Sequence, residues 1–187
     1  MSKGVTQELK IPRDIWVMVT AGFIIALGYG LIAPLLPQFI VSFDVSMAAA
    51  GLVVSIFSAS RLVFAPGAGR LIDRVGTRGV YLTGLLTVAI TTGLVGIAQE
   101  YWHIVVLRAI AGIGSTMFTV AAMALIVKLS PPPIRGRCSA TYATSFLLGN
   151  VIGPLVGASL SFLGFRWPFF IYGLGVALAA LAVWILM

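Results

Sequence analysis

The chain has 187 residues, of which 60% are hydrophobic and 9% are charged, and its formal net charge is +7. Soluble domains usually hold about one-half apolar and about one-quarter charged residues. Twelve bases, five acids and one histidine cannot give this chain a polar exterior, so an ordinary soluble domain is excluded and a surface that mostly faces lipid is predicted.

The bases lie between apolar segments, not in basic runs interleaved with aromatic residues, so we expect no nucleic-acid partner. The single cysteine, Cys138, excludes an internal disulfide and a cysteine pair for a metal. We expect a small buried side chain there, and neither a metal nor another cofactor. The first apolar run is too long for a cleavable signal peptide and lacks a small-residue cleavage pattern, so we expect it to remain as the first membrane helix.

Six apolar segments follow a polar tail of residues 1–14, and each has the roughly 20 residues that a helix needs to cross a bilayer. Backbone groups in lipid must be hydrogen-bonded within their own segment, and hydrophobicity does not alternate along these segments, so helices are predicted and a barrel is not. The predicted spans are 15–40, 47–68, 79–98, 103–127, 139–163 and 167–187. Residues 15–187 are therefore predicted to form one transmembrane domain of an all-α membrane protein with six transmembrane helices.

The connections between these segments differ in charge. Nine of the twelve bases fall on one side of the membrane, in the tail, the second connection and the fourth: Lys3, Lys10, Arg13, Arg70, Arg74, Arg78, Lys128, Arg135 and Arg137. The opposite connections hold only Arg166, with the acids Asp44 and Glu100. The positive-inside rule then predicts a multi-pass protein of the cell membrane with a cytoplasmic amino terminus. Because the sixth segment stops at Met187 with no flanking base or polar tail, we expect these residues to be part of a longer protein.

The first segment carries glycines and prolines toward its outer end, with a tyrosine among them: Gly28, Tyr29, Gly30, Pro34 and Pro37. Proline interrupts the helical hydrogen bonds and glycine permits close helix packing. This stretch resembles the first-helix motif of the twelve-helix drug and proton antiporters of the major facilitator superfamily, and helix bending explains it equally well. We expect Tyr29 to contact a substrate.

The second connection has a Gly/Asp/Gly spacing with flanking bases: Gly69, Asp73, Arg74, Gly76 and Arg78. It resembles the signature loop of the same superfamily, although Thr77 stands where that family usually has a base. The glycines permit a tight turn and close helix approach, and Asp and Arg form charge-assisted hydrogen bonds. The resemblance therefore implies a conformational latch loop, and an ordinary basic loop is the alternative.

Two arginines fall inside predicted spans. Arg108 is followed by Gly112 and Gly114, which resembles the fourth-helix pattern of the family, and the resemblance implies a role in proton coupling. A guanidinium in hydrocarbon must face a water-filled cavity or a partner; bonds to backbone carbonyls are the alternative. Arg61 lies nearer the cytoplasmic end, where it either faces the cavity or extends its head to the interface.

The fifth segment contains Gly149, Asn150, Gly153, Pro154 and Gly157. Glycines four residues apart form a flat small-residue face, and Pro154 allows the helix to bend. The stretch resembles the fifth-helix motif of exporters in the superfamily, with generic glycine packing as the alternative. We expect Asn150 to contact either a substrate or a neighbouring helix.

The resemblance covers almost the whole chain and implies one half of a major facilitator bundle, itself a 3+3 inverted repeat. It implies a secondary active transporter that exports a small, lipophilic compound by alternating access, coupled to protons. Because one half cannot enclose the midplane site of this family, we expect a second six-helix half or a homodimer. We expect the partner to contact exposed glycine-rich faces of the first, fourth and fifth segments. No acid lies inside a predicted span, so the titrating group would be Asp73 or belong to the missing half.

Two alternatives to transport remain. The first is a non-transporting membrane scaffold or an inactive transporter fragment, and the second is an intramembrane hydrolase. A hydrolase needs a serine within reach of a histidine base. Ser115 and His103 are twelve residues apart, which on one helix is about 18 Å, and no phosphate-binding loop is present. We therefore expect no enzyme, and an interfacial His103.

Overall fold

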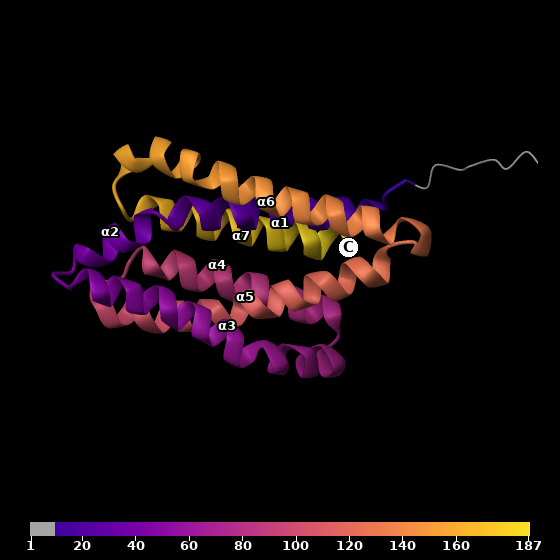
Figure 1. Cartoon of the computed structure of the whole chain (residues 1–187), viewed down its shortest axis with the longest axis horizontal. Coiled ribbons are helices and arrows are strands. Elements are labelled where there is room, and N and C mark those ends of the chain that lie inside the picture. Colours follow the sequence, from indigo (N-terminus) through magenta and orange to yellow (C-terminus); the bar gives the residue numbers. More distant parts are fainter. Residues whose placement is uncertain (1–9) are drawn as a thin grey trace, which may run out of the picture.

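The computed structural model describes residues 10–187, which are helical with short connections and contain no strand. Residues 1–9, which include Lys3 and most of the predicted tail, lie outside the described part of the chain. Six long helices run side by side (Figure 1), as predicted: α1 (Arg13–Ile32), α3 (Met47–Val75), α4 (Thr77–Val95), α5 (Tyr101–Leu129), α6 (Arg135–Ser159) and α7 (Trp167–Leu186). The short elements are α2 (Leu35–Val41), η1 (Pro132–Ile134) and η2 (Ser161–Leu163).

Five of the six long helices in the described residues are both long and apolar enough to cross a membrane, namely α1, α3, α4, α5 and α7. The sixth, α6, has 25 residues and therefore the length, but it is not apolar enough. Its first turn holds Arg135 and Arg137, and Asn150 and several Ser and Thr residues follow. It nevertheless lies along α1 over most of its length (Figure 1).

The first predicted span, 15–40, is not one helix. It divides into α1 and α2 at Ala33 and Pro34. Pro34 has no backbone N–H to continue the helical ladder. Pro37 is tolerated because it is the third residue of α2, where no intrahelical acceptor exists for its missing donor.

The predicted second connection is mostly helical, which corrects the expected loop. Helix α3 continues seven residues past the predicted end, so Gly69, Asp73 and Arg74 lie within it. The turn itself is a single residue, Gly76, with φ of 90° and ψ of 151°, after which α4 begins at Thr77. L side chains rarely adopt this conformation, so Gly76 is required there, whereas a Cβ on Gly69 would meet no atom within 4 Å.

The fifth predicted span, 139–163, is displaced toward the amino terminus. Helix α6 begins at Arg135, directly after η1, and ends at Ser159, and the remaining residues form η2. The side chain of Cys138 is fully buried, as expected.

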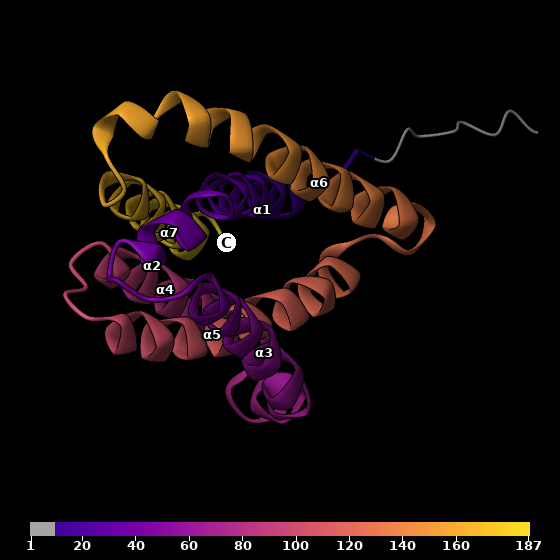
Figure 2. The same cartoon turned by 60° about the vertical axis from the view of Figure 1, so that its left-hand side comes forward.

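The helices pack in the order α6, α1, α7, α4, α5, α3 (Figure 2). Exchanging α1 with α5, α3 with α6 and α4 with α7 gives the same order read from the other end, so the two triplets occupy equivalent positions. The first helix of each triplet runs in the opposite direction to that of the other (Figure 1), which is the arrangement of the predicted 3+3 inverted repeat. The fully buried apolar side chains lie mainly between α1, α4, α5 and α7, and α3 and α6 form the two flanks.

The glycine-rich faces are buried within this bundle, which corrects the expectation that they are exposed. Glycines of α6 pack on the α1 backbone, and Gly112 and Gly114 of α5 pack on α3 and α4 respectively. A Cβ on Gly112 would lie 2.5 Å from the Phe57 carbonyl oxygen. The buried set comprises Gly28, Gly30, Gly112, Gly114, Gly149, Gly153 and Gly157. These faces hold the half together and are not available to a second half.

Candidate functional site: a cavity at the centre of the bundle

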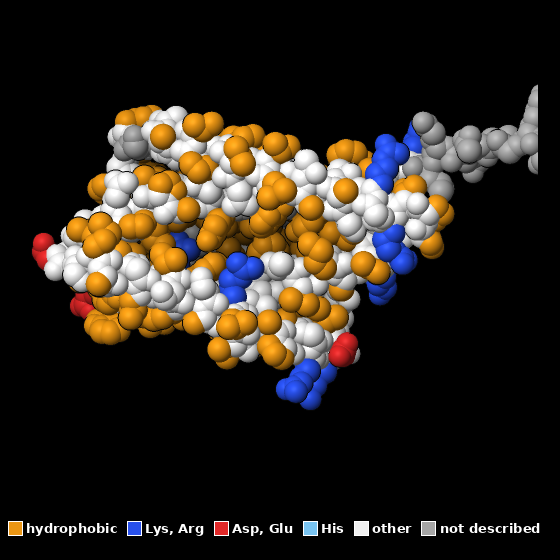
Figure 3. Space-filling view, in the orientation of Figure 1, with side chains coloured by type: hydrophobic (Ala, Val, Ile, Leu, Met, Phe, Trp, Pro, Cys, Tyr) orange, Lys and Arg blue, Asp and Glu red, His pale blue; other side chains and the backbone are white. Residues whose placement is uncertain are grey.

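A cavity of about 160 Å³ lies in the middle of the bundle and takes side chains from all six long helices. The space-filling view shows this face hollowed at its centre, with basic side chains inside the hollow (Figure 3). The polar and aromatic residues of its wall are Tyr29, Phe57, Arg61, Thr92, Arg108, Ser115, Phe118, Thr119, Phe146, Asn150 and Tyr172. The inverted-repeat packing therefore brings together residues that are far apart in the sequence.

Arg108 is the charged group deepest in this cavity. Its side chain is only 5% exposed, and its Nε and Nη2 atoms have no hydrogen-bond partner among the described residues. The alternative in which it bonds backbone carbonyls is therefore not what this structure shows. An unpaired guanidinium in a membrane interior carries a large desolvation cost, and Arg108 has hydrogen-bond donors that the described residues do not use.

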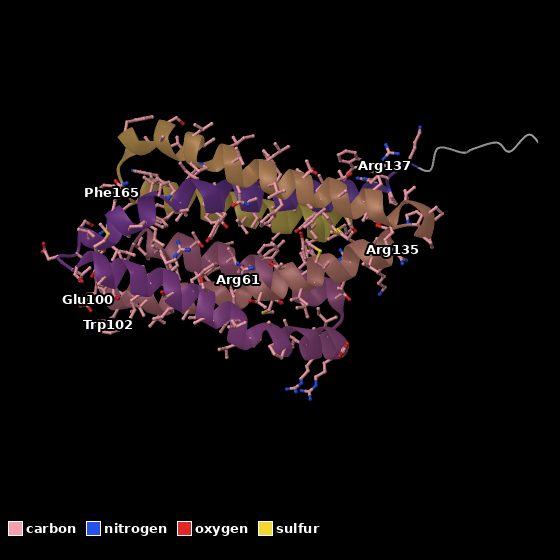
Figure 4. All side chains as sticks on the ribbon, in the orientation of Figure 1. Arg61, Glu100, Trp102, Arg135, Arg137 and Phe165 are labelled. Carbon is pink, nitrogen blue, oxygen red and sulfur yellow. The ribbon has the colours of Figure 1, made fainter. Side chains whose placement is uncertain are left out.

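Arg61 stands at the side of the same cavity, on α3. Its guanidinium carbon lies 5.8 Å from the centroid of the Phe57 ring, within cation–π range. It points from the middle of the bundle, not from an end (Figure 4), so of the two predicted roles the structure favours the cavity. The α3 backbone is fixed here because Thr116 Oγ1 of α5 donates to the Arg61 carbonyl at 3.1 Å.

Both residues expected to contact a substrate line the cavity. The Tyr29 ring is stacked on Phe57, with ring centroids 6.0 Å apart and 27° between the planes. Asn150 Nδ2 donates to the Phe146 carbonyl one turn earlier in α6, at 3.0 Å. Asn150 therefore makes its hydrogen bond within its own helix, and the bond to a neighbouring helix is not seen.

Sequence reasoning missed several members of the wall, among them Thr92 and Tyr172. Thr92 is 1% exposed and its Oγ1 has no hydrogen-bond partner in the described chain, whereas the adjacent Thr91 Oγ1 donates to the Thr87 carbonyl at 2.6 Å. Tyr172 lies over Gly28, where a Cβ would overlap its ring. A polar threonine pair in mid-span was the only signal in the sequence, and nothing in it distinguished the two threonines.

The residues of the predicted latch loop lie away from the cavity, at the end of the bundle where Lys and Arg gather (Figure 3). Asp73 and Arg74 are exposed, and no ion pair involves Asp73 within residues 10–187. Arg78 is different, because its Nη2 donates to the Trp184 carbonyl at 2.7 Å and joins the start of α4 to the end of α7. A latch through Asp73 stays a prediction that needs a partner beyond these residues.

Ser115 lines the cavity, but His103 does not. His103 lies in the first turn of the same helix, α5, against a surface groove with Trp102 and Gln99. The two side chains do not form the dyad that a hydrolase requires.

Comparison with known proteins identifies the fold. The family model described as Major Facilitator Superfamily matches residues 18–187.

The chain belongs to the Major Facilitator Superfamily.

Membership places it among transporters and not among enzymes, as the sequence predicted. Curated relatives include Multidrug resistance protein 2 of Bacillus subtilis, 26% identical over 181 residues, which are 96% of this chain and 44% of that protein. Quinolone resistance protein NorA of Staphylococcus aureus is 24% identical over 161 residues, 86% of this chain and 42% of that protein. Both agree with the antiporter-branch resemblance, and the chain spans less than half the length of either relative.

Solved structures agree on the fold. A peptide transporter POT in complex with sulfate matches with a TM-score of 0.85 at 18% identity, over 93% of this chain and 37% of that one. The human organic anion transporter MFSD10 matches with a TM-score of 0.78 at 23% identity, over 94% of this chain and 48% of that one. The superfamily chain described here therefore has the fold of one six-helix half.

Proposed function

We propose that this chain is one half of a secondary active transporter that exports a small molecule by alternating access, coupled to protons. The observation that carries this proposal is the central cavity, where side chains of all six long helices surround an unpartnered Arg108. The relatives are named for multidrug and quinolone resistance, which supports a lipophilic aromatic compound as the exported substrate.

The cavity needs a second half to become a pathway. The helices form an open arc that ends at α3 and α6 (Figure 2). Apolar side chains project from these two flanks and are strongly exposed: Leu62 77%, Val63 80%, Leu147 65%, Val151 70% and Leu155 71%. A further six-helix half is also what the relatives' greater length allows. We place that half, or a second copy of this chain, on α3 and α6.

The distribution of charge supports the orientation. Most of the described bases lie at the end where α6 begins, whereas Asp44 and Glu100 lie at the other end (Figures 3 and 4). By the positive-inside rule the first end is cytoplasmic in the cell membrane.

Flux measurements on proteoliposomes test the transport proposal. We expect the reconstituted chain to move a fluorescent quinolone when a proton gradient is imposed, and Arg108→Ala to abolish that flux. Arg137→Ala is the matched control, because Arg137 is exposed in the first turn of α6 and is not in the cavity wall. Flux that ignores the gradient and survives Arg108→Ala defeats the coupling; the absence of any flux from a folded chain shows that a second copy of this chain is not the missing half.

A further inference from the structure

The cavity has an excess of positive charge. Two guanidinium groups, Arg61 and Arg108, belong to its wall, and no acidic residue from the described part of the chain does. The described acids lie at helix ends and connections: Asp14 in the first turn of α1, Asp73 in the last turns of α3, and Asp44 and Glu100 in connections. Arg108 is buried and Arg61 is exposed at the side of the cavity, and a site with these two bases and no acid among the described residues favours a bound anion.

Buried hydrogen-bond donors without partners also favour a bound anion. Arg108 Nε and Nη2 and Thr92 Oγ1 are buried in the wall without partners within residues 10–187. The guanidinium offers donors only, in a planar fork that matches a carboxylate, and the threonine hydroxyl adds another donor. Leaving such groups unsatisfied costs free energy, so a ligand whose oxygens accept hydrogen bonds from them is stabilised there.

The volume of the cavity and the other residues of its wall indicate the size of this ligand and its aromatic character. The volume of about 160 Å³ is close to that of a cavity of roughly 150 Å³ known to hold benzene. Tyr29 and Phe57 present stacked rings to it, and Phe146 and Tyr172 complete an aromatic lining. Offset or edge contacts between aromatic rings stabilise binding beyond burial of area.

We propose that the cavity binds an organic anion built on one aromatic ring, with its acid group on Arg108 and Thr92 and its ring against Tyr29 and Phe57. This inference rests on the proposed function, since it names the substrate class of the same cavity. A carboxylate that meets Arg108 has two sources, a free anionic ligand or an acidic side chain of the second half. Binding of free probes to the purified chain, which lacks the second half, distinguishes them.

The test compares three probes of nearly equal shape and different charge: 4-fluorobenzoate, 4-fluorobenzamide and 4-fluorobenzamidine. Their dissociation constants are measured by fluorine NMR titration of the purified chain in lipid nanodiscs. We expect the anion to bind about tenfold or more tightly than the neutral amide, as charge-assisted hydrogen bonds predict, and the cation to bind most weakly.

Variants then locate the site. Arg108→Gln should remove the preference for the anion while binding of the neutral amide persists, which also shows that the variant is folded. Thr92→Val keeps the shape of the side chain and removes the hydroxyl. It should weaken binding of the anion severalfold and leave binding of the amide nearly unchanged. Arg137→Gln removes an exposed base far from the cavity and should change nothing.

Three results overturn the proposal. Tightest binding of the cation means that this half recognises no anion. Equal binding of the anion by wild type and Arg108→Gln places the anion elsewhere. Binding of none of the probes to a chain that is helical and monodisperse shows that the cavity is not a site for this class. Because binding is measured without flux, these results are independent of whether the chain transports.

Discussion

Gly153 of α6 lies directly against the carbonyl of Leu27 in α1. A Cβ on Gly153 would be 2.5 Å from that oxygen and 2.7 Å from the Gly30 Cα. Gly149 and Gly157 repeat the contact one turn to either side, against the Phe23 and Leu31 carbonyls. Helices in lipid associate through close packing because lipid supplies little hydrophobic drive between them, so this contact sets how near α6 approaches α1 and how far the cavity is closed on that side.

Gly153→Ala should therefore destabilise the bundle, because backbone atoms on α1 cannot move aside as a flexible side chain would. We expect a loss of about 1–3 kcal/mol in the free energy of unfolding, the usual cost of overpacking. Gly69→Ala is the same chemical change in a helix where the new methyl meets nothing within 4 Å. Denaturant titration in detergent should show the loss for Gly153→Ala and none for Gly69→Ala; equal effects would mean that the close approach is not required.

Gly28 and Tyr172 should be energetically linked. The added methyl of Gly28→Ala would occupy the space of the Tyr172 ring, so we expect it to destabilise the wild-type chain by about 1–3 kcal/mol. In a Tyr172→Ala background the methyl has room, and the same substitution should cost much less. A double-mutant cycle of unfolding free energies measures the difference. Additive costs in the two backgrounds would show that the ring is not what Gly28 accommodates.

Arg166 should stabilise the end of the bundle opposite the basic cluster. Its Nη1 donates to the Gly96 carbonyl at 3.0 Å, and its guanidinium carbon is 5.7 Å from the centroid of the Phe39 ring. A base at the amino-terminal end of α7 is opposed by the helix dipole, but we expect the two contacts to outweigh this term. Arg166→Gln should lower the free energy of unfolding by about 1 kcal/mol, measured against Arg137→Gln. An unchanged or higher stability would show that the dipole term is the larger.

The orientation can be checked with single cysteines in a Cys138→Ala background. Gly136→Cys lies at the basic end of the bundle and Gln99→Cys at the acidic end, and both positions are exposed. In intact cells a membrane-impermeant maleimide should label Gln99→Cys alone, and Gly136→Cys should react only after the membrane is opened. The reverse pattern would contradict the positive-inside assignment.

The sequence by itself predicted six membrane helices, the family resemblance and four residues that line the cavity, Tyr29, Arg61, Arg108 and Asn150, because hydrophobic length and motif spacing are local properties of a chain. It misplaced the ends of helices where the backbone geometry of a proline or a glycine decides them. The first span breaks at Pro34, and the expected loop at Gly69 is helix that turns only at Gly76.

Tertiary structure decided what each motif faces. Glycines at intervals of four indicate a packing face, but only the assembled bundle shows that those of α6 are used by α1 and are not exposed. The contrast between Thr91, which bonds its own helix, and Thr92, which lines the cavity with a buried hydroxyl that has no partner among the described residues, likewise depends on helix rotation in the bundle. That rotation is set by packing among residues distant in sequence, which no local pattern records.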